Sequence, residues 1–191
     1  MLVVVGLWNP ESRYEGTRHN LGAEVVEVLA DRTGTTLKRG PFRVRAMVGR
    51  CRIGDEPVIL ALPRTNMNLA GPAVQSVQRY FKADLDDLLI LHDDIDVPFG
   101  KLKLQTDRGP GGHNGIRSVI GAMKSRDFWR LKMGVGRPPG RMDPAKFVLT
   151  RFNSKERPEM DLMVQHSADV VEAFVSDRER AVRMAGEWGS Q

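Results

Sequence analysis

Apolar and polar residues alternate along the chain with two kinds of periodicity, one typical of strands and one typical of helices. The stretches 2–8 and 87–94 each contain a continuous apolar run, which is typical of buried strands. The stretch 42–53 instead alternates sides like a half-exposed strand. In chain order, strands are predicted at 2–8, 42–53, 57–63, 87–94, 101–105 and 129–138.

Helical spacing of apolar residues separates most of these strands. Helices are predicted at 20–33, at 70–82, from His113 onward and along 155–187. No repeat, linker or low-complexity segment interrupts the pattern. Strands and helices that alternate in this way predict one α/β domain built around a single mixed sheet.

Composition narrows the class of protein. The single cysteine, Cys51, excludes an internal disulfide framework and a multi-cysteine metal cluster. No apolar stretch approaches the ~18 residues typical of a membrane span, and the amino terminus lacks the charged leader of a signal peptide. We therefore expect a soluble, cytoplasmic protein without a membrane partner.

Positive charge is concentrated in one part of the chain. Residues 101–150 contain 11 Lys and Arg against 3 Asp, a net charge of +8, although the whole chain carries only +5. A basic segment of this kind attracts polyanions, nucleic acid above all. A solvated basic face with no ligand remains the alternative.

Polar residues that could take part in catalysis or ligand binding follow several of the predicted strands. Open α/β sheets place their ligands at such strand ends. They are Asn9, His19, Asn66, Asn68, His92, Asp93, Asp94, Asp96, His113 and Asn114. Asn and Asp in loops are usually turn formers. Their recurrence after several strands favours a shared site.

Nucleophilic and metal chemistry receive little support. The chain has no G-x-S-x-G elbow, and Cys51 lies inside an alternating strand. Asp93, Asp94 and Asp96 could bind Mg²⁺, but alternation would turn Asp93 away from the other two. The remaining option is a histidine general base that activates water, oriented by a carboxylate and assisted by asparagine amides.

Five segments together resemble the bacterial peptidyl-tRNA hydrolase family: VGLWNPESRYEGTRHNLG, RTNMNLAG, LHDDIDVPFGKLKL, GPGGHNGIRS and RLKMGVGRP. They occur in order, with fitting spacing, over about residues 3–150. The resemblance implies a single domain, 1–191, with a mixed, twisted central sheet flanked by helices. It also implies hydrolysis of the ester that joins a peptide to tRNA, with no metal or cofactor, by a protein expected to be a monomer.

Residue roles follow from the same resemblance. It makes His19 the general base and Asp93 its orienting carboxylate. Lys103 and Lys132 fall where the family contacts tRNA phosphate, and His113 is expected to serve the architecture of its loop. The substrate-binding positions are Asn9, Tyr14, Asn66, Asn68 and Asn114.

Four residues depart from the family pattern near these positions. Trp8 and Glu11 replace glycines on either side of Asn9. Asn66 stands where an aromatic residue is usual, and Ala70 replaces a usual serine. None of them removes the proposed base or its carboxylate. The alternative function is a non-catalytic RNA-binding protein on the same scaffold, and a weaker one is a metal-dependent nucleotide hydrolase.

Overall fold

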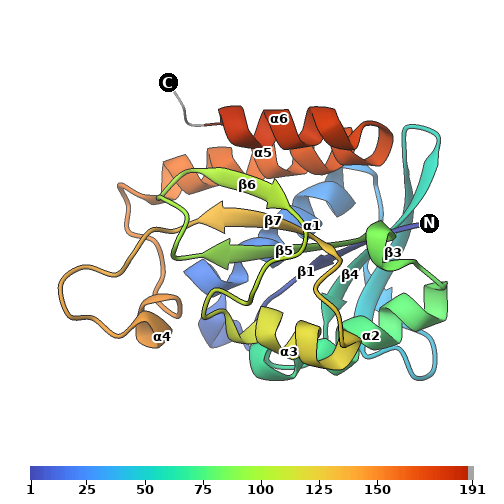
Figure 1. Ribbon diagram of the computed structural model, residues 1–191, viewed down its shortest axis with the longest axis horizontal. Helices are drawn as coiled ribbons and strands as arrows, with labels where there is room; N and C mark the ends of the chain where they lie inside the picture. Colours follow the sequence, from blue (N-terminus) through green and yellow to red (C-terminus); the bar gives the residue numbers. More distant parts are fainter. Residues whose placement is uncertain (189–191) are drawn as a thin grey trace.

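The computed structural model describes residues 1–188 and contains one seven-stranded mixed sheet (Figure 1). The strand order across the sheet is β2-β3-β4-β1-β5-β7-β6, and β4, β1, β5 and β7 are parallel neighbours. The strands are β1 (Leu2–Gly6), β2 (Lys38–Arg39), β3 (Ala46–Ile53), β4 (Glu56–Pro63), β5 (Leu88–Asp94), β6 (Leu102–Gln105) and β7 (Trp129–Gly134). The predicted fold class is confirmed.

Helices cover both faces of the sheet. In Figure 1, α5 and α6 lie above the sheet, and α2 and α3 lie below it. The helices are α1 (Leu21–Arg32), α2 (Ala70–Phe81), α3 (Asn114–Met123), α4 (Pro144–Phe147), α5 (Arg157–Ser176) and α6 (Arg178–Glu187). Short 3₁₀ turns also occur, among them η1 (Ser12–Tyr14), η2 (Arg18–Asn20) and η3 (Met67–Leu69).

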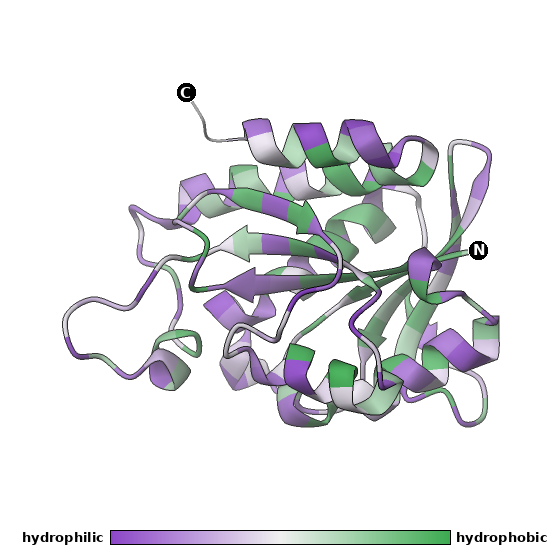
Figure 2. Ribbon diagram, viewed as in Figure 1, coloured by the Kyte–Doolittle hydropathy of each residue, from purple (hydrophilic) through white to green (hydrophobic). Residues whose placement is uncertain are grey.

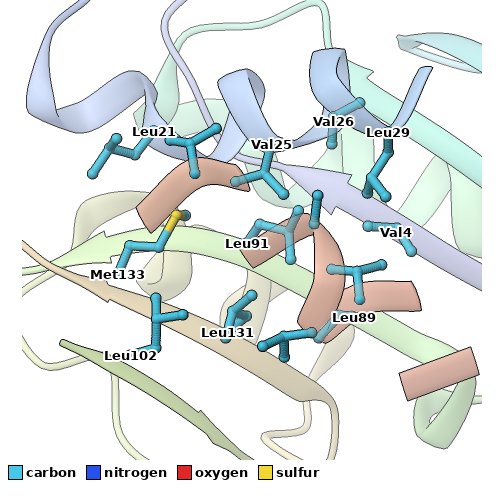
Figure 3. Close-up of a cluster of buried hydrophobic side chains, with 14 of the residues drawn as sticks. Val4, Leu21, Val25, Val26, Leu29, Leu89, Leu91, Leu102, Leu131 and Met133 are labelled. Carbon is cyan, nitrogen blue, oxygen red and sulfur yellow. The ribbon is translucent and has the colours of Figure 1, made fainter. Parts of the chain in front are cut away.

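The central strands are buried on both faces and supply two separate cores. In β5, Leu89 and Leu91 join the core shared with α1 and α5, whereas Leu88 and Ile90 join the core shared with α2 and α3. Figure 3 shows side chains of α1 pointing toward those of β1 and β5 in the first core. Burying each Leu or Val side chain contributes about 1.5–3 kcal/mol, so the parallel strands are firmly held.

Several predicted boundaries differ from the structure, and one short strand was missed. The strand predicted over 42–53 begins only at Ala46, because a turn closed by Val44 N and Pro41 O precedes it. The helical stretch 155–187 breaks at Asp177, which has extended dihedral angles and caps α6 by accepting from Arg180 N. The two-residue strand β2 carries no apolar pattern and was missed.

The distribution of hydrophilic residues agrees with this layering. Figure 2 shows α6 with hydrophilic residues on its outer side, while β5 is hydrophobic along its first half and hydrophilic at its carboxyl end. Among residues 1–188, no helix combines the length and apolar character needed to cross a membrane.

Candidate functional site

The carboxyl ends of the parallel strands carry the polar residues that the sequence singled out. Asn9 follows β1, Asn66 and Asn68 follow β4, and Asp93 and Asp94 are the last two residues of β5. Because β4, β1 and β5 are parallel neighbours, these ends lie at one edge of the sheet, where α/β proteins place ligands.

Two glycines bring the start of α1 against the sheet. A side-chain carbon added at Gly22 would come within 2.8 Å of Leu7 N and would overlap Leu91 O. One added at Gly6 would overlap the backbone of Gly22 in turn. Only glycine permits this close approach, which places His19, in the turn before α1, opposite the end of β5.

His19 and Asp93 form a buried hydrogen-bonded pair. The Nδ1 of His19 lies 2.7 Å from Oδ1 of Asp93, and the two residues are 7% and 1% exposed. An ionised carboxylate accepts only, so Nδ1 carries the proton and Nε2 is left with its lone pair. No partner for Nε2 occurs within the described residues, and His19 lines an open hollow. The imidazole is therefore held in the form that can accept a proton.

His113 belongs to the same cluster, which the sequence did not predict. Its Nδ1 accepts from Ile116 N and caps α3, as expected of a residue serving loop architecture. Its Nε2 therefore carries the proton and donates to Asp93 Oδ1 over 3.0 Å. One carboxylate oxygen thus orients two imidazoles, and His113 contacts Asp93 in addition to capping α3.

Burial and hydrogen bonding set the protonation states of this cluster. Burial opposes ionisation of Asp93, but the neighbouring His19 and His113 outweigh it and hold the pKa of the carboxyl well below its ordinary value. Burial, together with the adjacent His113, lowers the pKa of His92 well below its usual range. Burial also lowers the pKa of His113, although Asp93 opposes that shift. Two of the three imidazoles are therefore neutral at pH 7.

These pKa shifts predict an acid-sensitive fold. A histidine held neutral takes up a proton on unfolding once the pH falls below about 6.5, the pKa of the unfolded side chain. The free energy of unfolding should then decrease by up to about 1.4 kcal/mol per pH unit for each such histidine. Asp93, whose pKa is lowered, favours folding above about pH 4 and adds nothing to the loss near pH 6.

The variant His92→Asn tests this dependence, since its amide can still donate to Asp93 O as His92 Nδ1 does over 2.6 Å. Denaturant unfolding at pH 8 gives the packing cost of the change. Between pH 6.5 and 5 the variant should lose stability less steeply than the wild type. Parallel curves would show that His92 does not remain neutral in the fold.

Asn9 lies in a loop held by buried hydrogen bonds. Its Oδ1 accepts from Met67 N over 2.9 Å, while its backbone exchanges hydrogen bonds with the side-chain amide of Asn20. Trp8 donates from Nε1 to Pro63 O over 2.6 Å and packs against the core. The loop after β1 is therefore joined to the end of β4, and the Asn9 Nδ2 group has no partner in the described part of the chain.

The other predicted substrate-binding residues are less buried. Asn66 and Asn68 are exposed around η3, Tyr14 is half-buried in η1, and the Arg13 guanidinium stacks on its ring. Asn114 is exposed at the start of α3 and lines the same hollow as His19. Its Oδ1 accepts from Arg117 Nη1 over 2.9 Å, so its NH₂ group remains available to a ligand.

The hollow beside His19 has a volume of about 250 Å³ and lies between the histidine cluster and α4. Arg18 fixes the chain beyond α4, because its guanidinium binds both carboxylate oxygens of Glu156 at 2.8 and 2.7 Å. Backbone bonding reinforces this, since His19 N donates to Val148 O. Arg18 was not predicted, and only its place within TRHN could have drawn attention to it.

The carboxylates of Asp93, Asp94 and Asp96 do not converge. Asp94 pairs with Lys132 Nζ at 2.8 Å and Asp96 pairs with Arg137, while Asp93 bonds to the histidines. The alternation expected for Asp93 and Asp94 is observed. Donor atoms of His19, Asp93 and His113 lie within 4.8 Å of one another, but both imidazole N–H groups already point at the carboxylate.

The two predicted phosphate-contacting lysines occupy different environments. Lys103 and Lys132 are register partners on β6 and β7. Lys103 is exposed and has no ion pair among the described residues. The Lys132 side chain is only 12% exposed and is engaged by Asp94.

A buried arginine that the sequence did not predict supports the glycine-rich loop before α3. Arg130 is fully buried on β7, and its guanidinium donates to Gly109 O over 2.9 Å and to Arg108 O. Burial lowers the pKa of this guanidinium. These bonds fix the loop that leads to His113, and no local sequence signal predicts them.

Together these features define an α/β protein with a buried histidine–carboxylate pair beside a ligand-sized hollow, an arrangement suited to general-base hydrolysis. A family model described as peptidyl-tRNA hydrolase matches residues 3–187, and the chain belongs to that family. The family resemblance found in the sequence is confirmed.

Individual relatives agree with the family match. A mitochondrial peptidyl-tRNA hydrolase from Oryza sativa subsp. japonica is 49% identical over 168 residues, covering 87% of this chain and 66% of the relative. A peptidyl-tRNA hydrolase from Frankia casuarinae is 45% identical over 175 residues, covering 92% and 88%. A crystal structure of the enzyme from Acinetobacter baumannii is 34% identical with a TM-score of 0.92, covering 98% and 95%.

Proposed function

We propose that this protein hydrolyses the ester bond of peptidyl-tRNA and releases free tRNA and peptide. The observation that carries the proposal is the His19–Asp93 hydrogen bond of 2.7 Å, which leaves Nε2 of His19 unbonded beside the hollow. Membership of the peptidyl-tRNA hydrolase family supports the choice of substrate.

In the proposed mechanism, His19 Nε2 takes a proton from a water molecule as that water attacks the ester carbonyl. The Asp93 carboxylate stabilises the imidazolium that forms. The tetrahedral intermediate then collapses, and the ribose oxygen leaves with the proton held on Nε2. The products are a tRNA with a free ribose hydroxyl and a peptide carboxylic acid, which releases its proton to solvent and leaves as the carboxylate.

Asparagine amides are proposed to hold the substrate around this base. Asn9 and Asn114 each have their side-chain oxygen engaged, by Met67 N and by Arg117, so each presents N–H donors. Such donors stabilise the negative oxygen of the intermediate without titrating. Asn66 and Asn68 are proposed to contact the ester from the turn after β4, and Tyr14 to contact the tRNA.

The deciding experiment measures release of an N-blocked peptide from tRNA by the purified protein, with and without EDTA. We expect turnover in both, since the proposed steps use only side chains and water. Tight tRNA binding without release would favour the RNA-binding alternative. Loss of turnover on chelation, restored by Mg²⁺, would favour the metal-dependent one.

The two lysines should respond differently to substitution. Lys103→Ala should raise KM for peptidyl-tRNA with little change in kcat, because binding a remote phosphate contributes equally to the ground state and the transition state. The slope of log KM against log salt should be shallower by about 0.7–0.9 for each phosphate that Lys103 neutralises.

Lys132→Ala should instead lower the free energy of unfolding by about 3 kcal/mol, because it leaves the Asp94 carboxylate buried and unpaired.

Salt titrations of KM and denaturant unfolding of both variants separate these effects. Equal salt slopes for Lys103→Ala and wild type would mean that the tRNA phosphates are bound elsewhere.

The cytoplasmic location and the monomeric state remain predictions. Size-exclusion chromatography with light scattering tests the monomeric state.

A further inference from the structure

A second basic surface lies outside the segment 101–150. Two adjoining hollows share the chain that leads into β3: the larger, of about 1040 Å³, lies between that chain and α2, and the other lies between it and the end of β4. Neither shares a lining residue with the hollow beside His19. We call this surface the arginine groove; its arginines are Arg39, Arg43, Arg45, Arg64 and Arg79.

The charge of the arginine groove is unbalanced. All five arginines are exposed, and none forms an ion pair with a carboxylate of residues 1–188. The described residues that line the two hollows include no Asp or Glu. Five guanidinium groups therefore share one surface with no carboxylate among the described lining residues. Such a positively charged surface favours a polyanionic ligand.

Aromatic rings accompany these charges. Phe42 is 86% exposed and Tyr80 is 47% exposed, and both line the larger hollow. Phe42 is presented by a turn closed by Val44 N and Pro41 O, in which Arg43 has a φ of 73°. Non-glycine residues rarely adopt this conformation, and here it leaves Phe42 and its neighbour Arg43 projecting from the surface.

The base of the arginine groove is well ordered. Arg45 N donates to Ser76 Oγ over 2.9 Å, which joins the lead into β3 to α2. The groove also extends to Arg64 and Thr65, directly before Asn66 and η3. It is thus a built surface that approaches the loop holding Asn9.

We propose that the arginine groove binds a single strand of RNA. Guanidinium groups would bind the phosphates, and the bases would stack on Phe42 and Tyr80. Stacking requires free base faces, which a duplex does not offer to side chains. An acidic peptide would pair with the arginines, but its carboxylates would not stack on the two rings. The choice of RNA over DNA rests on the proposed function, but binding requires no hydrolysis.

Fluorescence anisotropy of a labelled single-stranded RNA of about twelve nucleotides, within the length that such grooves cover, tests the proposal. Phe42→Ala should weaken binding about 5- to 100-fold, the effect of removing the stacking of one base. Leu162→Ala is the matched control, because Leu162 is also highly exposed, at 62%, but lies on α5. Equal affinities of the two variants would overturn the proposal.

Charge is tested separately. Each phosphate of a single strand that the protein neutralises adds about 0.7 to the log–log salt slope, so Arg43→Ala with Arg45→Ala should reduce it by about 1.4. Arg52→Ala with Arg183→Ala removes the same charge outside the groove and should leave the slope unchanged. An equally large reduction in this control would overturn the proposal.

Two competitors complete the test. A duplex of the same RNA should displace the probe poorly, whereas a Glu-rich peptide that displaces it as well as unlabelled strand would assign the groove to acidic peptides. The probe should also bind the His19→Ala variant. If the protein bound the RNA probe but did not hydrolyse peptidyl-tRNA, only the proposed function would be refuted. If it hydrolysed peptidyl-tRNA but did not bind the probe, only the present inference would be refuted.

Discussion

Replacing Asp93 by Asn is expected to lower kcat for peptidyl-tRNA hydrolysis by about 10³–10⁴-fold. The same change in the Ser-His-Asp triad lowers kcat by about 10⁴-fold, because a neutral amide permits the wrong histidine tautomer and no longer stabilises the imidazolium. In this protein the change should disturb both imidazoles, because Asp93 Oδ1 accepts from both His19 and His113. The measurement is single-turnover hydrolysis across pH, in which the acid limb of the rate should move to lower pH.

Asp94→Asn is the matched control. It removes the neighbouring carboxylate, whose partner is Lys132 rather than a histidine. Its cost should appear in the free energy of unfolding, with kcat changed by less than about tenfold. If the two variants reduced kcat equally, Asp93 would not be the carboxylate that serves His19.

Replacing His19 by Ala should lower kcat by about 10²–10⁴-fold, the usual contribution of a positioned general base. The affinity for uncharged tRNA should change little, because the imidazole is only 7% exposed and faces the small hollow rather than an extended surface. Steady-state hydrolysis and a tRNA binding titration measure the two quantities independently.

His166→Ala provides the corresponding control, since this imidazole stacks on Trp188 and lies outside the site. It should leave kcat unchanged. Turnover near the wild-type value in purified His19→Ala would refute the assignment of the base and direct attention to His113.

The strands and helices that could be predicted from sequence are those in which burial requires a regular pattern of apolar residues. β5 shows this well, because Leu88–Leu91 must be apolar on both faces. The break between α5 and α6 was missed because apolar spacing continues across it, although Asp177 is a residue type that commonly begins helices. The turn at Arg43 could not be anticipated, since nothing about an arginine indicates a positive φ.

The candidate site was predictable in part for a similar reason. His19 and Asp93 lie in motifs that are local in sequence, and the structure brings them together. The contacts of Arg18 with Glu156 and of Arg130 with Gly109 join residues 138 and 21 positions apart. Such contacts depend on the final packing, which no short stretch of sequence encodes.

The alternation of Asp93 and Asp94 at the end of β5 makes hydrolysis a reporter of strand registry. A slip of β5 by one residue toward its carboxyl end would turn every side chain to the opposite face, so that His92 would replace Asp93 beside His19 and Asp93 would face Lys132. The slipped strand would still display leucines and isoleucine on both faces, so hydrophobic packing discriminates weakly between the two arrangements. Recovered activity after refolding therefore counts the molecules whose β5 has paired in register, whereas recovered helix or strand content counts both.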